Sequence, residues 1–191
     1  MGHGRSLGQY RALDLGLFCL MLLIFEYLVM TASTRWFPAQ PYTVSLVPLL
    51  FTVVLVRWGV WAALPGLLGG LWFCYLSGAE PSRYAVFCIG NLLPLLLIPF
   101  LASWRKEKGS FSGSLPAVGL GVAVLLLMQG GRALVSLLFG ADPALLPGFF
   151  TTEVVTDLFT LVVLWILRRL DGMLEDQRHY LQRLREEEAR S

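Results

Sequence analysis

Hydrophobic residues fill most of this chain in long stretches that short polar connections separate. Six stretches are apolar enough to be membrane segments, and they cover residues 13–31, 44–56, 58–76, 84–103, 115–139 and 149–167. A helix needs about 20 apolar residues to cross a bilayer, and the second stretch falls well short of that. We expect this stretch to begin within the preceding loop or to be covered by its neighbours. The pattern predicts an all-α integral membrane protein, folded as a compact bundle of six transmembrane helices.

Lysine and arginine in the flanking segments indicate the orientation, because cytoplasmic flanks carry an excess of both. With the amino terminus inside, the inner flanks carry Arg5, Arg11, Arg57, Arg105, Lys106, Lys108, Arg168 and Arg169. The outer flanks carry only Arg35 and Arg83. The bias predicts a multi-pass protein of the cell membrane with both termini in the cytoplasm.

The second and third stretches are joined by a very short turn that holds Arg57. The second contains Pro48, and the third is rich in glycine, with Gly66, Gly69 and Gly70. Small residues in membrane helices let backbones approach closely, so we interpret these glycines as packing residues. Such a pair suits a compact bundle with a chamber at one end better than a passive anchor.

Composition agrees with the membrane class and excludes a nucleic-acid binder. The chain is 56% hydrophobic and 15% charged, whereas soluble domains average about 25% charged residues. The net charge of +2 comes without a basic stripe. The cysteines lie inside apolar stretches without the spacing of a zinc site or a redox pair, so we interpret them as small core residues; they are Cys19, Cys74 and Cys88.

Ionisable residues within apolar stretches are costly and indicate function by default. The chain has four such candidates, all in the outer half of the predicted bundle: Glu26, Arg132, Glu153 and Asp157. Glu153 and Asp157 are four residues apart and would share a helical face. In one interpretation Arg132 neutralises a carboxylate and joins the last two helices. In the other, the group lines a polar chamber where Arg132 or a carboxylate orients a small solute. Both can hold, since three carboxylates outnumber one arginine.

Further residues could contribute to such a chamber. Tyr27, Gln129 and Thr156 are polar and could join the four charged residues. Asn91 either forms a hydrogen bond between helices or takes part in the pocket. The outer loop after the first stretch carries Trp36 and Tyr42 among prolines. This loop is either an interfacial aromatic belt or a lid over an outward-facing pocket.

No catalytic set is evident. Both histidines, His3 and His179, lie in the predicted cytoplasmic tails. The sequence shows no serine–histidine pair, no metal-binding cluster and no phosphate-binding loop. We therefore expect neither an enzyme nor a bound cofactor.

The last part of the chain, residues 168–191, changes to a charged composition and is separate from the transmembrane domain, residues 1–167. Its apolar residues fall on one helical face, which comprises Leu170, Met173, Leu174, Gln177, Leu181 and Leu184. The remaining positions are charged, with mixed signs. The pattern predicts a cytoplasmic amphipathic helix that docks on a protein partner or on membrane lipid; the alternative is a solvated tail with a few buried leucines.

The run Val44-Ser-Leu-Val-Pro, followed by Arg57-Trp-Gly, by Gly66 and by Gly69-Gly-Leu, resembles the substrate-binding S components of energy-coupling factor (ECF) transporters. The six-span layout is similar as well. The resemblance implies that the chain binds a vitamin-like micronutrient in an outward-facing pocket under a lid loop. It also implies a transmembrane coupling subunit and separate ATPases as partners for uptake.

The predicted sites follow from these observations. The ligand-binding residues are Glu26, Trp36, Tyr42, Arg132, Glu153 and Asp157. The resemblance further implies that small residues of the first helix meet the coupling subunit, and the spacing that fits is Ala12 with Gly16. With the tail, the predicted partner-binding residues are therefore Ala12, Gly16, Leu170, Leu174 and Leu181.

Two other functions stay open. The chain could be a membrane sensor module that signals through its carboxy-terminal helix. It could also be a six-span scaffold resembling the cell-shape protein MreD, although the third stretch contains no acidic residue and the outer charges would lack a role. A membrane enzyme is the least supported alternative.

Overall fold

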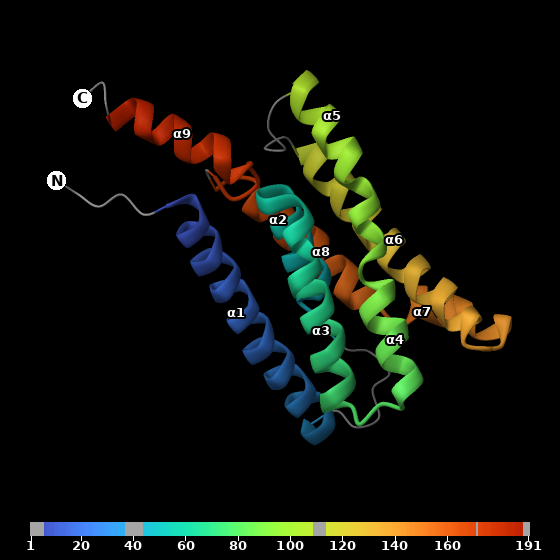
Figure 1. The fold of residues 1–191 in the computed structure, drawn as a ribbon. Helices are drawn as coiled ribbons and strands as arrows, with labels where there is room; N and C mark the ends of the chain where they lie inside the picture. The colour runs from blue at the N-terminus through green and yellow to red at the C-terminus, as the bar shows by residue number, and fades with distance from the viewer. Residues whose placement is uncertain (1–5, 37–43, 109–113, 171, 189–191) are drawn as a thin grey trace.

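The structure is a computed structural model that describes residues 6–36, 44–108, 114–170 and 172–188, and in these ranges it is helical without any strand. The elements (Figure 1) are α1 (Leu7–Trp36), α2 (Val47–Trp58), the 3-10 helix η1 (Gly59–Ala62), α3 (Ala63–Leu76), α4 (Pro81–Gly90), η2 (Leu93–Leu97), α5 (Ile98–Lys108), α6 (Ser114–Leu138), η3 (Pro143–Leu145), α7 (Leu146–Thr151), α8 (Val154–Leu167) and α9 (Gln177–Glu188). The predicted all-α class is confirmed.

Among the described residues, five helical stretches are long and apolar enough to cross a membrane: Leu7–Trp36, Val47–Leu76, Pro81–Trp104, Leu115–Leu138 and Pro143–Leu167. The sequence predicts six such stretches. The numbers differ because Val47–Leu76 is one stretch in the structure and contains most of two predicted stretches, residues 44–56 and 58–76. This stretch folds back on itself, because Phe51 of α2 packs beside Gly66 of α3, and Val47 beside Gly69. The chain turns at Gly59, whose φ of 61° favours glycine. The long apolar run is therefore a helical hairpin, α2–η1–α3.

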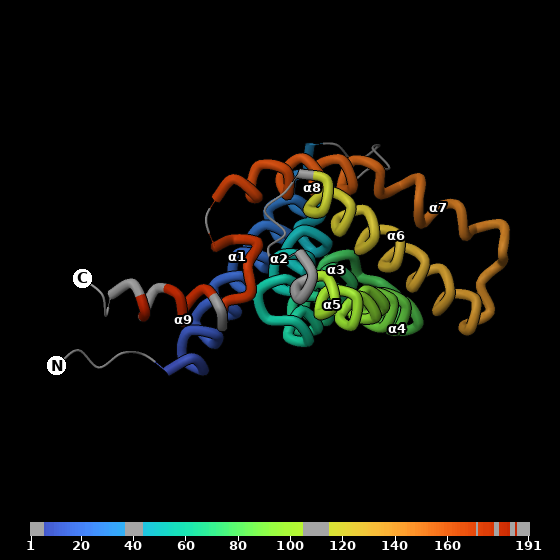
Figure 2. Tube along the Cα trace, turned by 90° about the horizontal axis from the view of Figure 1, so that it is seen from above, coloured from blue at the N-terminus to red at the C-terminus, as the bar shows by residue number. Residues whose placement is uncertain are grey.

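Helix α2 is the centre of the bundle. Eleven of its 12 residues are buried, and it packs against α1, α3, α6 and α8; Figure 2 shows it between these neighbours. A helix that is apolar on all sides is expected to be buried. At 1.5 Å per residue it spans about 18 Å, less than the roughly 30 Å of a bilayer core. The prediction of a short helix covered by its neighbours is confirmed.

The fourth predicted stretch is a broken helix. Helix α4 ends at Gly90, and the chain continues through Asn91 into η2, where Pro94 has no N–H to donate. At this break α4 and α6 lie close together. The absence of a side chain at Gly131 permits this approach, since an added Cβ would lie 2.5 Å from the Gly90 carbonyl oxygen. The contact brings Arg132, the next residue of α6, to the end of α4.

The last apolar stretch also has a break. Helix α7 ends at Thr151 and α8 begins at Val154, so Glu153 precedes α8 instead of lying on its face. Its backbone, with φ −96° and ψ 3°, is not helical. The predicted spacing of one helical turn between Glu153 and Asp157 is kept, because the Glu153 carbonyl accepts the Asp157 backbone N–H at 2.9 Å. The difference from the prediction is that Glu153 is the N-cap residue of α8 and not part of the helix.

The two ends of the bundle differ in what they hold. Figure 1 shows that α1 begins at the end where α9 lies, and we call this the inner end. The opposite end, where α2 begins, is called the outer end. Leu174, between α8 and α9, is buried in the main core. The first part of the predicted tail is therefore packed into the bundle. The prediction of one helical face from Leu170 to Leu184 is wrong, because α9 begins only at Gln177 and Leu170, Met173 and Leu174 precede it.

Candidate functional site

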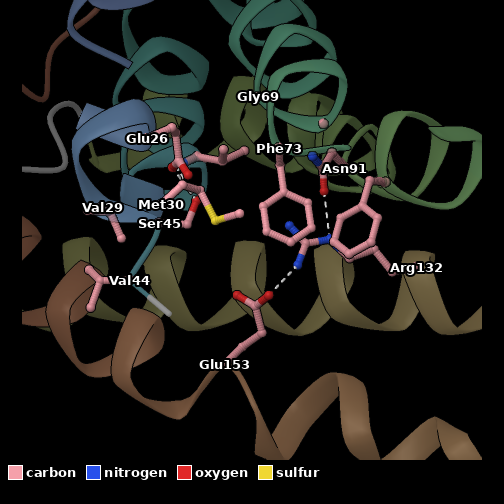
Figure 3. A pocket seen from close by; sticks show the side chains of 13 residues that line it. Glu26, Val29, Met30, Val44, Ser45, Gly69, Phe73, Asn91, Arg132 and Glu153 are labelled. Atoms are coloured by element: carbon pink, nitrogen blue, oxygen red, sulfur yellow. Dashed lines mark hydrogen bonds and ion pairs between the residues drawn. The ribbon is translucent and has the colours of Figure 1, made fainter. Parts of the chain in front are cut away.

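A small cavity lies at the outer end, beside the start of α2 (Figure 3). Its volume, taken as the space open to the centre of a water molecule, is about 20 Å³. Three predicted ligand residues line it: Glu26, Arg132 and Glu153. Ser45 and Asn91 add further polar groups. The five side chains come from α1, the segment before α2, the end of α4, α6 and the residue before α8, so distant parts of the chain converge here.

Glu26 forms one wall and holds the beginning of α2. Its side chain is 2% exposed, and its Oε1 accepts hydrogen bonds from Ser45 Oγ at 2.6 Å and from the Leu46 backbone N–H at 2.8 Å. The Ser45 backbone N–H donates to Thr156 Oγ1 of α8 at 3.1 Å. Free N–H groups at a helix start need such acceptors, and the helix dipole favours a negative charge there. Glu26 therefore stabilises the start of α2 from a neighbouring helix.

Arg132 forms the opposite wall. Its Nε donates to Asn91 Oδ1 at 2.8 Å, and its Nη1 donates to Glu153 Oε1 at 3.0 Å. The guanidinium also lies over the ring of Phe87, 4.9 Å from the centroid. Asn91 is fixed in turn, since its Nδ2 donates to the Gly66 carbonyl at 3.0 Å. These contacts agree with the interpretation in which Arg132 neutralises a carboxylate and joins the last two helices.

Aromatic rings and glycines complete the cavity. Phe73 of α3 and Phe87 of α4 both line it, with ring centroids 4.8 Å apart. Figure 3 shows Phe73 between Glu26 on one side and Arg132 on the other. Gly69 and Gly70 lie in the same wall, and an added Cβ at either position would meet a neighbour closely. The interpretation of these glycines as close-packing residues is confirmed.

Two other predicted ligand residues, Trp36 and Asp157, do not line the cavity. Asp157 points to α6, where Gln129 Nε2 donates to both of its carboxylate oxygens at 2.8 and 2.9 Å. Trp36 ends α1 and is 74% exposed. Tyr42 lies outside the described residues. The structure thus brings together three of the six predicted ligand residues.

A larger groove adjoins the cavity on the side of α4, α6 and α7. Its volume is about 580 Å³, and Phe87 and Glu153 line both spaces. Arg83 and Ser82 at the start of α4 add polar groups to a wall that is otherwise largely apolar. Ligand sites for small molecules commonly measure about 300–1,000 Å³, so this groove, and not the cavity, has the size of a solute site.

A second polar network lies at the inner end. Asp14 of α1 accepts from Arg57 Nε at 2.9 Å and from Arg57 Nη2 at 3.0 Å, and it also accepts from Trp58 Nε1 at 2.6 Å. Arg57 Nη1 donates to the Gly172 carbonyl at 2.8 Å, and Gln177 Nε2 donates to the same oxygen at 2.8 Å. The network ties the start of the tail to α1 and α2.

The predicted partner-binding residues have different environments. Ala12 and Gly16 lie on an exposed face of α1, and no atom would come within 4 Å of a Cβ added to Gly16. Leu170 is 53% exposed, and Leu181 lines a groove with Tyr10 and Leu13 of α1 and other inner-end residues. Leu174 is 4% exposed. Leu174 is therefore buried by other residues of the same chain. The other four predicted residues remain accessible candidates for partner binding.

Sequence reasoning missed two residues that the structure makes important. Ser45 links Glu26 to the start of α2, and the signal for it was a serine directly before an apolar run, a common position for polar groups at a helix start. Asp14 was overlooked although it is a carboxylate at the beginning of an apolar stretch. The basic flanks already indicate that Arg57 lies at the inner end, where the first stretch begins with Asp14. This orientation would have suggested that the two residues form a pair.

Comparisons with known proteins add no identity to this geometry. No family model matches the chain, and searches of curated proteins and of solved structures give no match. Within the described residues, no group of three histidine, cysteine or acidic side chains gathers to hold a metal ion.

Proposed function

We propose that the protein is a membrane-embedded binding subunit for the uptake of a small, vitamin-like solute in the cell membrane. The observation that carries the proposal is the convergence of Glu26, Asn91, Arg132 and Glu153 on one cavity within an otherwise apolar bundle. Ionisable groups at membrane depth are costly, and they characteristically mark substrate pathways.

The length of α2 explains why space exists at this end. The surrounding stretches have 24 to 30 residues, whereas α2 has 12. A short central helix inside longer neighbours leaves part of the bundle axis unfilled at one end. Here the unfilled part lies beyond Val47, the first residue of α2, which lines the cavity itself.

The solute occupies the groove beside α4, α6 and α7 and reaches into the cavity. The groove of about 580 Å³ holds the body of the solute, and the cavity of about 20 Å³ receives one small group. Glu153 and Phe87 form the shared wall, so the Arg132–Glu153 pair lies where both parts meet.

The protein binds but does not energise transport. A coupling subunit and ATPases supply the energy, as the resemblance to S components implies. The exposed face of α1 with Ala12 and Gly16 supports a helix–helix contact with the coupling subunit, because small residues permit close approach in membranes.

The test is thermal unfolding of the purified full chain with a panel of vitamins. A ligand that binds only the folded state raises the unfolding midpoint. We expect one panel member to do so in the parent and in Arg169→Gln, a control at the inner end, and not in Arg132→Gln. ATP should be neither bound nor hydrolysed. A folded sample that responds to no member of the panel would contradict the proposal.

The sensor function remains the second candidate, and one observation favours it. Arg57 joins the hairpin α2–η1–α3 to the Gly172 carbonyl at the start of the tail. A displacement of α2 at the outer end would therefore be passed to the tail. A solute that changes proteolysis of the tail, without any uptake in the presence of a coupling subunit, would support sensing.

A further inference from the structure

We propose that the cavity beside Glu26 binds a primary ammonium group of the solute. This inference rests on the proposed function and names the chemical class of its ligand. Three properties of the cavity support it: an unused carboxylate oxygen, an excess of negative charge, and a volume for one small group.

The carboxylate of Glu26 is only half used. Both of its hydrogen bonds go to Oε1, from Ser45 Oγ and from the Leu46 N–H, and no described residue donates to Oε2. Neither donor carries a full charge, and the start of α2 contributes only about half an elementary charge. An ionised Glu26, in a residue that is 2% exposed, has this little compensation, and an approaching positive group stabilises the ionised form.

The rest of the wall does not supply that positive group. Arg132 is directed to Glu153 and Asn91, with its guanidinium stacked over Phe87. The cavity therefore carries two carboxylates, Glu26 and Glu153, against one guanidinium. A cationic ligand group balances these charges, whereas an anionic group adds to the excess.

The volume selects the kind of cation. A cavity needs about 10–15 Å³ of space for the centre of a water molecule to hold one water, and this one has about 20 Å³. A primary ammonium group is close to water in size and has three donors, which suit the carboxylate oxygens. A quaternary ammonium group, with four carbon substituents, is too large. The body of the solute then lies in the adjoining groove, past Glu153.

The experiment compares two cations on the full chain. Thermal unfolding is measured with methylammonium chloride and with tetramethylammonium chloride, against sodium chloride at equal ionic strength. The variants are Glu26→Gln and, as a control, Asp142→Asn in the exposed turn before η3. Glutamine keeps an acceptor oxygen for Ser45 and Leu46, so the start of α2 is preserved while the charge is removed.

We expect methylammonium to raise the unfolding midpoint of the parent and of Asp142→Asn, and tetramethylammonium to raise neither. In Glu26→Gln the dissociation constant for methylammonium should rise more than about tenfold, as for removal of one partner of a buried charge pair. A shift that persists in Glu26→Gln, equal shifts with both cations, or no shift with methylammonium overturns the inference. If a vitamin binds in these cases, the proposed function stands and only the ammonium assignment is wrong; if no vitamin binds either, the proposed function fails too.

Discussion

The inner and outer ends of the bundle each contain a partly buried arginine–carboxylate pair, and the two pairs differ in how completely they are satisfied. At the inner end, Asp14 uses both oxygens, Arg57 uses three nitrogens, and one positive charge meets one negative charge. At the outer end, Arg132 contacts a single oxygen of Glu153, and Glu26 adds a second carboxylate next to a cavity. A fully satisfied network is characteristic of a structural clamp, and the incomplete network is the one that we propose as a binding site.

The largest effect is expected from breaking the inner pair. Arg57→Met leaves the Asp14 carboxylate, whose side chain is 20% exposed, without its cation and the Gly172 carbonyl without one of its donors. Removing one partner of a buried pair costs about 3–5 kcal/mol, and we expect about 2–4 kcal/mol here because the pair is not fully buried. Chemical unfolding measures the loss, and limited proteolysis reports release of the tail.

The matched control is Arg183→Gln, which removes an exposed contact with Glu175. Exposed pairs contribute about 0–1 kcal/mol. If Arg57→Met destabilises the protein no more than this control does, the inner network is not a structural clamp. Solute binding by Arg57→Met, measured under conditions where the variant is folded, should match that of the parent, since the cavity is at the other end.

A smaller effect is expected at the outer end from Gly69→Ala. The new methyl group would collide with the side chain of Val47 in the cavity wall, and overpacking of this kind costs about 1–3 kcal/mol. Gly16→Ala is the control, because nothing lies within 4 Å of the added carbon. It should leave the unfolding free energy unchanged or raise it by up to about 1 kcal/mol through helix propensity. Equal destabilisation by the two substitutions would show that Gly69 is not a packing position.

The smallest perturbation tests which end faces outward. Single cysteines at Ala141 and at Ser110, in a variant without the native cysteines, should leave stability unchanged. The basic flanks place Ala141 outside and Ser110 in the cytoplasm, so an impermeant maleimide applied to intact cells should label only the cysteine at position 141. Labelling only at position 110 would reverse the orientation and put the cavity on the cytoplasmic side.

Hydrophobic pattern was sufficient for the class of the fold and for the covered position of α2. A run such as Val47–Trp58, apolar on every side and too short to cross a bilayer, has few alternatives to burial. The same reasoning found Glu26, Arg132 and Glu153, because a charge within an apolar run stands out and must find partners.

Partnerships between distant residues were beyond the reach of the sequence. Asp14 and Arg57 are 43 residues apart, and Asp157 meets Gln129 across 28 residues. Helical periodicity indicates which residues share a face, but not which face meets which neighbour. The break before α8 shows a second difficulty, because Glu153 lies outside the helix that its spacing from Asp157 suggested.

The hydrogen bonds that hold α2 also bear on how the protein is assembled during synthesis. The Ser45 N–H bonds to Thr156 across 111 positions, and Arg57 bonds to Gly172 across 115. When α2 leaves the ribosome, neither partner has been made, so these two hydrogen bonds can form only after α8 and the segment that follows it have been synthesised. A nascent chain ending before α8 would already contain most of the apolar surface of the bundle, yet it would lack Glu153 and the bond from Ser45 to Thr156. The walls of the cavity are thus incomplete until the chain has been synthesised past Glu153.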